Sequence, residues 1–156
     1  MNEYIEHVQE ELKRVDHLIY VSLKYTRTVD VIRSIIVRII NAYDFMMDAV
    51  IYDLKQKGVV QAMPQLPGLK CELLKKHFAD QKNIVDCLDF YLMLRKIMRS
   101  KYKSSQEFRR HVTMTVGVID IDTGEKKAIE VNMDVVKEYY EKTKLCFEEV
   151  LRYLNV

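Results

Sequence analysis

The chain has 156 residues with 4 Gly, 2 Pro and a formal net charge of +2. This length suits one domain with a real core, and so few Gly and Pro leave little room for an all-β fold. No apolar run reaches the roughly 20 residues of a membrane span, and the first residues lack the order of a signal peptide. We therefore expect one cytoplasmic, mainly α domain over residues 1–156, with no membrane partner.

The first half of the chain predicts two long antiparallel helices. Apolar residues recur at helical spacing over residues 2–24 (Ile5, Val8, Leu12, Val15, Ile19). Residues 28–57 are apolar over most of a helix circumference, and their polar groups form one narrow stripe. This second helix should therefore be a central helix, a dimer-forming helix or both. We expect Thr28 to cap its start and a homodimer to form through residues 28–57.

The joint between these helices holds two cations, Lys24 and Arg27, beside Tyr25. Backbone amides at a helix start can help to hold a phosphate. Lys24 and Arg27 are therefore a secondary anion-binding candidate, and an ordinary polar turn is the alternative.

The second half predicts further helices and a short β element. A short helix over 67–79 should precede a longer one over 81–100, with Asp80 as its cap. The Ser-x-x-Glu pattern of residues 104–107 resembles a capping box and predicts a helical turn. Alternating apolar residues then predict a β-hairpin at about 111–131, with a bulge or bend near Gly117. A last helix should begin near Asn132 or Asp134. The fold class is thus an up-and-down bundle of about five helices with one β-hairpin before the C-terminal helix.

The positive charge is concentrated in one segment, from Arg95 to His111, in which Glu107 is the only acidic residue. Arg95, Arg99 and Lys103 have the four-residue spacing of one helix face. Tyr102 and Phe108 interleave with the cations, and exposed aromatics can stack on unpaired bases. This pattern predicts binding to RNA, DNA or a nucleotide, and a solvated basic surface is the alternative. The candidate binding residues are Arg95, Arg99, Lys101, Lys103, Arg109, Arg110 and His111.

Motifs for catalysis, metals and cofactors are absent from the sequence. Asp44 and Asp48 lie one helical turn apart but lack an accompanying Glu-x-x-His pair, so we expect no metal and no cofactor. The three cysteines (Cys71, Cys87, Cys146) are interpreted as small buried apolar residues. His111 could act as an acid or base in RNA cleavage with Arg109 or Arg110. We otherwise assign no catalytic residue and favour a protein that is not an enzyme.

Three phrases, LKYTRTVDVI, FYLMLRKIMRS and EFRRHVTMTV, lie in a succession of amphipathic helices around the long helix at 28–57. This arrangement resembles small prokaryotic, especially archaeal, HEPN-type proteins. The resemblance implies a helical bundle that dimerises and that binds nucleotide or nucleic acid or cleaves RNA without metal. The ribonuclease members carry an Arg followed, after four to six residues, by a His. That pair is not matched here, so the resemblance carries over no catalytic residue.

Together these features predict a dimeric, non-enzymatic binding protein that contacts phosphates through its basic segment. A diverged HEPN-like, metal-independent ribonuclease is one alternative. A structural adaptor subunit that joins a protein partner through the long helix or the hairpin is the other.

Overall fold

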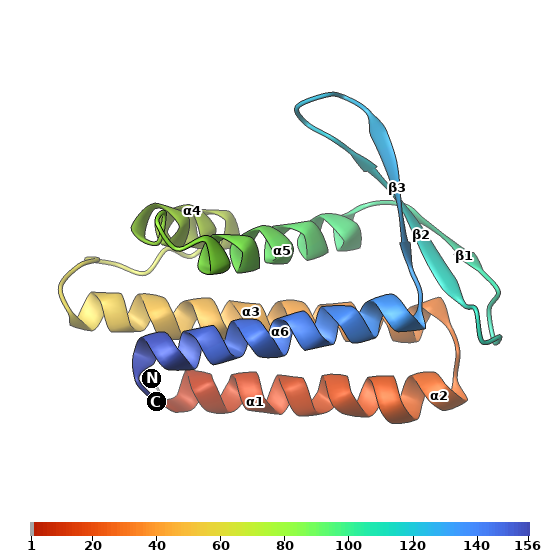
Figure 1. Cartoon of the computed structure of the whole chain (residues 1–156), viewed down its shortest axis with the longest axis horizontal. Coiled ribbons are helices and arrows are strands. Elements are labelled where there is room, and N and C mark those ends of the chain that lie inside the picture. The colour runs from red at the N-terminus through yellow and green to blue at the C-terminus, as the bar shows by residue number, and fades with distance from the viewer. Residues whose placement is uncertain (1) are drawn as a thin grey trace.

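The computed structural model describes residues 2–156, which form a mainly helical fold of five helices and a small sheet (Figure 1). The elements are α1 (Asn2–His17), a π-helical turn (Leu18–Ser22), α2 (Leu23–Tyr25), α3 (Val29–Gln56), α4 (Pro67–His77), α5 (Lys82–Arg99), β1 (Tyr102–Ser105), β2 (Thr113–Ile119), β3 (Lys126–Val131) and α6 (Met133–Leu154). The backbone stays helical from α1 through the π turn into α2, so these three form one helix. The predicted helices are therefore confirmed.

Helix α3 is the centre of the bundle. It packs against α1, α6, α4 and α5, and its buried side chains belong to one apolar cluster that spans these helices (Figure 1). The Thr28 side chain accepts a hydrogen bond from the Val31 N–H at 3.3 Å, so the predicted cap is confirmed. Among the described residues of α3, Val37 is the most exposed large apolar side chain, at 41 %. The neighbouring helices of the same chain thus bury the apolar sides of α3. The homodimer through this helix stays a prediction.

The expected lone hairpin is wrong, because three antiparallel strands form a sheet in the order β1-β2-β3. Strand β1 includes the residues that were predicted to begin a helical turn. Ser104 and Ser105 pair instead with Met114 and Thr113 of β2. The Glu107 side chain, which a capping box would direct to Ser104, accepts from a backbone N–H of α3.

A bulge or bend was predicted near Gly117, and the bulge is wrong. Strands β2 and β3 pair without interruption from Met114 opposite Val131 to Ile119 opposite Lys126. The apolar alternation changes phase because Ile119 and Ile121 are exposed near the tip of this pair, which projects away from the helices (Figure 1).

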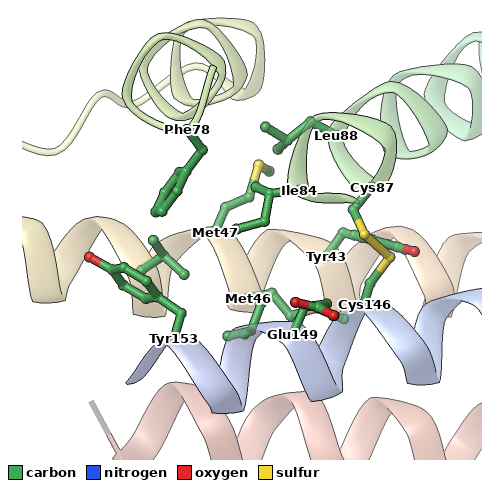
Figure 2. A pocket seen from close by; sticks show the side chains of 12 residues that line it. Tyr43, Met46, Met47, Phe78, Ile84, Cys87, Leu88, Cys146, Glu149 and Tyr153 are labelled. Atoms are coloured by element: carbon green, nitrogen blue, oxygen red, sulfur yellow. A yellow bond between two sulfur atoms is a disulfide. The ribbon is translucent and has the colours of Figure 1, made fainter. Parts of the chain in front are cut away.

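Two of the three cysteines form a bond that the sequence did not predict. Cys87 of α5 and Cys146 of α6 are joined as a disulfide, with their Cα atoms 6.1 Å apart (Figure 2). Cys71 is the free, buried residue that was expected, and burial raises the pKa of its thiol to about 11. The predicted cap at Asp80 is wrong as well, since Gln81 occupies that position and makes no side-chain cap.

Several segments that are distant in sequence meet at one end of the bundle (Figure 1). The joint between α2 and α3, the loop between β1 and β2 and the start of α6 all lie at this end (Figure 1). Helix α6 finishes at the opposite end, where α1 begins. The fold therefore brings segments that are distant in sequence to one surface.

Candidate nucleic-acid interface

The predicted basic segment does not form one continuous patch. Arg95 and Arg99 lie on α5, which ends at Arg99, whereas Lys103 lies in strand β1. The expectation that Arg95, Arg99 and Lys103 share a helix face is therefore wrong. The segment divides into the end of α5, strand β1 and the loop that follows it.

Arg95 belongs to a polar cluster inside the bundle. Its guanidinium lies 5.8 Å from the ring centre of Tyr91, and the Tyr91 hydroxyl donates to Asp44 at 2.5 Å. Burial raises the pKa of the Asp44 carboxyl, while the hydrogen bond from Tyr91 and the charge of Arg95 oppose that rise. Arg95 is half-buried, and its positive charge favours the ionised form of the Asp44 carboxyl on α3. It is separate from the exposed cations of the segment.

Lys101 and Lys103 flank Tyr102 along the edge of the sheet. The Lys101 carbonyl accepts from the Gly117 N–H, and Lys103 lies opposite Thr115, so both lysines belong to the same face of the sheet. Both are exposed. Tyr102 points to the other face, where the Arg33 guanidinium lies 4.2 Å from its ring centre.

The loop after β1 docks on the joint between α2 and α3. The Phe108 N–H donates to the Arg27 carbonyl at an N···O distance of 2.6 Å. Both carboxylate oxygens of Glu107 lie 3.3 Å from the Val29 N–H, at the first turn of α3. A carboxylate at a helix N-terminus is stabilised by the unpaired amides and the helix dipole. The Val29 amide is thus occupied by the chain's own carboxylate and is not available to a phosphate at this joint.

This docking places the two predicted cation groups beside each other. We call the resulting surface, formed by Lys24, Tyr25, Arg27, Phe108, Arg109, Arg110 and His111, the loop-end surface. Tyr25 and Phe108 are 79 % and 76 % exposed, so their rings are open to solvent. The cations other than half-buried Arg27 are exposed too. The nearby acidic groups in sequence are Asp30 and Glu107, and Glu107 is engaged by the Val29 amide.

His111 and Arg110 border a hollow of about 260 Å3 at the start of α6. Asp134 and Lys137 of α6 line the same hollow. The Asn132 side chain caps the helix by accepting from the Val135 N–H at 2.9 Å. Sequence reasoning found no acid or base near His111. Asp134 and Lys137 were missed because the chain returns through β2 and β3 before α6 begins beside His111, and no local sequence pattern predicts that return.

Asp44 and Asp48, which were considered as metal ligands, have partners within the protein. Asp44 accepts from Tyr91, and Asp48 pairs with Lys70 at 2.7 Å. Over residues 2–156 no three His, Cys, Asp or Glu side chains gather as a metal-binding group.

A small cavity of about 50 Å3 lies beside the disulfide, between α3, α5 and α6 (Figure 2). Met46, Met47 and Phe78 are among its lining residues, and Glu149 supplies a carboxylate. This volume is well below the roughly 300 Å3 at which ordinary ligand pockets begin. The cavity is therefore a packing feature of the core rather than the candidate site.

No protein-family model, curated protein or solved structure gives a significant match to this chain. The HEPN resemblance thus stays a prediction. None of the helices within residues 2–156 has both the length and the apolar character needed to cross a membrane.

Proposed function

We propose that the protein binds single-stranded nucleic acid through the loop-end surface and does not cleave it. One observation carries this proposal: the hydrogen bond from the Phe108 N–H to the Arg27 carbonyl joins two cationic segments that are far apart in sequence. Lysine and arginine contacts supply salt-dependent affinity for phosphates. Exposed aromatic rings add stacking on unpaired bases, at about 1–3 kcal/mol per base.

The backbone of Phe108 supports a role in binding rather than in folding. Its φ angle of 65° lies in the left-handed region, which is unfavourable for a bulky side chain. The side chain gains little from burial in return, because it is 76 % exposed. The hydrogen bond to Arg27 thus helps to hold an apolar ring in solvent, which is the arrangement that base stacking requires.

Arg27 supports the same proposal. Its Nε atom is buried and has no hydrogen-bond partner among the described residues. A buried charged donor without an acceptor lowers stability unless a water molecule or a bound anion accepts from it. A phosphate oxygen becomes such an acceptor when binding moves the Arg27 side chain so that this atom is exposed at the loop-end surface.

The proposal is tested by fluorescence anisotropy of labelled single-stranded RNA and DNA over a salt series. We expect Arg109→Ala with Arg110→Ala to weaken binding about tenfold or more and to lower the slope of log affinity against log salt by about 1.4, which is the loss of two single-strand phosphate contacts. The matched control, Lys76→Ala with Lys82→Ala, removes two exposed cations of α4 and α5 and should bind normally.

Equal losses in the two double variants would contradict a localised site. Absence of binding at low salt would contradict the proposal and favour the structural adaptor. Co-purification of the chain with a fixed protein partner would support that alternative.

Metal-independent RNA cleavage is a second candidate function, favoured by the hollow that His111 shares with Asp134 and Lys137. These side chains supply the second acid or base that such chemistry requires. Cleavage of RNA in the presence of a metal chelator, lost in His111→Ala, would support this candidate. Intact RNA after long incubation with protein that binds it would exclude cleavage and leave the binding function in place.

A further inference from the structure

A second concentration of cations lies in a groove between α1 and α3, closed at one side by Met98 of α5. The groove has a volume of about 720 Å3, within the roughly 300–1,000 Å3 of small-molecule sites. Its polar lining consists of Lys13, Arg14, His17, Arg33, Ser34 and Arg38. We call it the arginine groove. These residues are scattered in sequence and converge because α1 packs along α3.

The guanidinium groups are held in place by neighbouring side chains. Arg14 and Arg38 both pair with one oxygen of Glu11, at 3.0 and 3.5 Å. Arg33 lies over the ring of Tyr102. Each arginine carries five N–H donors, so these contacts leave donors free for an anion. Arginine held in this way suits the multiple oxygens of a phosphate group.

Glu11 is the unusual member of this arrangement. It is only 5 % exposed, and its second carboxylate oxygen is buried without a hydrogen-bond partner among the described residues. A buried ion pair contributes little net stability, because desolvation of the charges offsets their attraction. Positioning the Arg14 and Arg38 side chains is a function that accounts for its presence.

Charge and shape together identify the class of ligand. Lys13, Arg14, Arg33 and Arg38 provide four positive charges and Glu11 one negative charge, so these five side chains sum to +3. Asp16 lies beside Lys13 in a neighbouring hollow and does not line the groove. Asp30 lies one turn from Arg33 on α3 but does not line the groove. The remaining wall is apolar and is formed by Leu18, Val37 and Met98.

We propose that the arginine groove binds an organic di- or triphosphate that carries an apolar or aromatic group. The phosphates contact the guanidinium groups, and the apolar group lies against Leu18, Val37 and Met98. Leu18 is also the first residue of the π-helical turn, a local widening of a helix that is frequent at functional sites. This site is separate from the loop-end surface and does not depend on it.

The test is isothermal titration calorimetry with adenosine triphosphate, pyrophosphate and adenosine as separate probes. We expect saturable binding of the triphosphate, weaker binding of pyrophosphate and none of adenosine. Lys13→Gln with Arg33→Gln should weaken triphosphate binding about tenfold or more, the loss expected for charge-assisted contacts. Neither substitution leaves Glu11 without its arginines, so the fold should be retained, and circular dichroism checks this.

The matched control is Lys76→Gln with Lys82→Gln, which changes the net charge equally at exposed positions of α4 and α5 and should leave triphosphate affinity unchanged. Arg38→Lys keeps the positive charge beside Glu11 but replaces the planar guanidinium group, with its paired N–H donors, by an ammonium group. This variant should stay folded and bind the triphosphate more weakly. The proposal is overturned by absence of triphosphate binding at millimolar concentration, by adenosine binding as tightly as the triphosphate, or by equal losses in the groove variant and in the Lys76→Gln, Lys82→Gln control. If RNA binding fails while triphosphate binding succeeds, only the proposed function of the loop-end surface is lost.

Discussion

The cations near the two ends of α3 differ in how they pair with carboxylates. Towards its C-terminal end, cations meet carboxylates: Lys70 with Asp48 at 2.7 Å, Lys57 with Asp53 at 2.9 Å, and Lys75 with Asp89. At the N-terminal end, Lys24, Arg27, Arg109 and Arg110 have no carboxylate within 4.0 Å among residues 2–156. Helix packing stabilises both ends, so the difference lies in the surface that each presents.

The use of Glu107 explains how this difference arises. It is the only acidic residue in its segment, yet it accepts from the Val29 amide rather than pairing with Arg109 or Arg110. The Glu107 carboxylate stabilises the start of α3 and holds the loop in place, while the positive charges of Arg109 and Arg110 are not neutralised by it. Pairing with carboxylates is thus frequent near the C-terminal end, although Lys55 and Lys76 there have no carboxylate within 4.0 Å among the described residues. The cations of the loop-end surface lack such pairs, which supports the binding that we propose for it.

The largest expected effect is on the C-terminal side, from breaking the disulfide between Cys87 and Cys146. Because the bond closes a loop with a sequence separation of 59 residues, its reduction should lower the free energy of unfolding by about 4 kcal/mol. Urea titrations with and without reductant measure this loss. RNA affinity, measured where both forms are folded, should be unchanged. A parallel fall in affinity would show that the two ends are coupled.

Removing the Glu107 carboxylate should affect the N-terminal end next most strongly. Glu107→Ala should lower the free energy of unfolding by about 1–2 kcal/mol, because the Val29 amide in the first turn of α3 loses its acceptor and the helix dipole loses a nearby negative charge. Loss of a negative charge alone would strengthen RNA binding. We expect several-fold weaker binding instead, since the loop leaves Arg27. Glu107→Gln, which keeps an acceptor oxygen, is the matched control in both assays, and tighter binding by Glu107→Ala would contradict the docking account.

Replacing Phe108 by glycine should separate stability from binding. Glycine removes the unfavourable left-handed conformation, so Phe108→Gly should raise the free energy of unfolding by about 1 kcal/mol. The same change should weaken RNA binding by about 1–3 kcal/mol through the loss of a stacked ring. Gln106→Gly is the matched control, because Gln106 also has a positive φ, of 57°, and it should gain stability without losing affinity. Unchanged affinity in Phe108→Gly would remove the stacking role.

The smallest effect concerns the internal charge of Asp44. Burial raises the pKa of this carboxyl, so its stabilising contribution is complete below the usual pKa of about 3.9 and is lost as pH rises through the raised value. Asp44→Asn can still accept from Tyr91. The variant should therefore gain stability relative to the native protein between acidic and neutral pH. Thermal melts over a pH series measure this gain, and a gain confined to acidic pH would contradict the sign.

Much of the helical fold was predictable because periodicity and capping are local signals. The cap at Thr28 and the start of α6 at Asn132 both followed from neighbouring residues. Strand β1 was missed because residues 104–107 locally match a capping box, whereas their real partners lie on β2. The disulfide was missed because helical spacing alone does not pair cysteines on different helices.

The candidate site was predicted in parts. Lys24 with Arg27, and Arg109 with Arg110, were each identified from sequence as possible phosphate contacts. Their union depends on a contact between Glu107 and Val29 across 78 residues, for which no local pattern exists. The arginine groove was missed for a similar reason, since Arg14 and Arg38 meet only through the packing of α1 on α3.

The most direct test of this account is nuclear magnetic resonance mapping of a short uridine oligonucleotide on the isotope-labelled protein. If the docked loop and the helix joint form one binding surface, amide signals of residues 24–28 and 106–111 should shift together along the same saturation curve. Signals of α4 should stay in place. Shifts confined to one of the two segments, or shifts spread over the paired cations near Asp48 and Asp53, would contradict the central claim that the loop-end surface is one site.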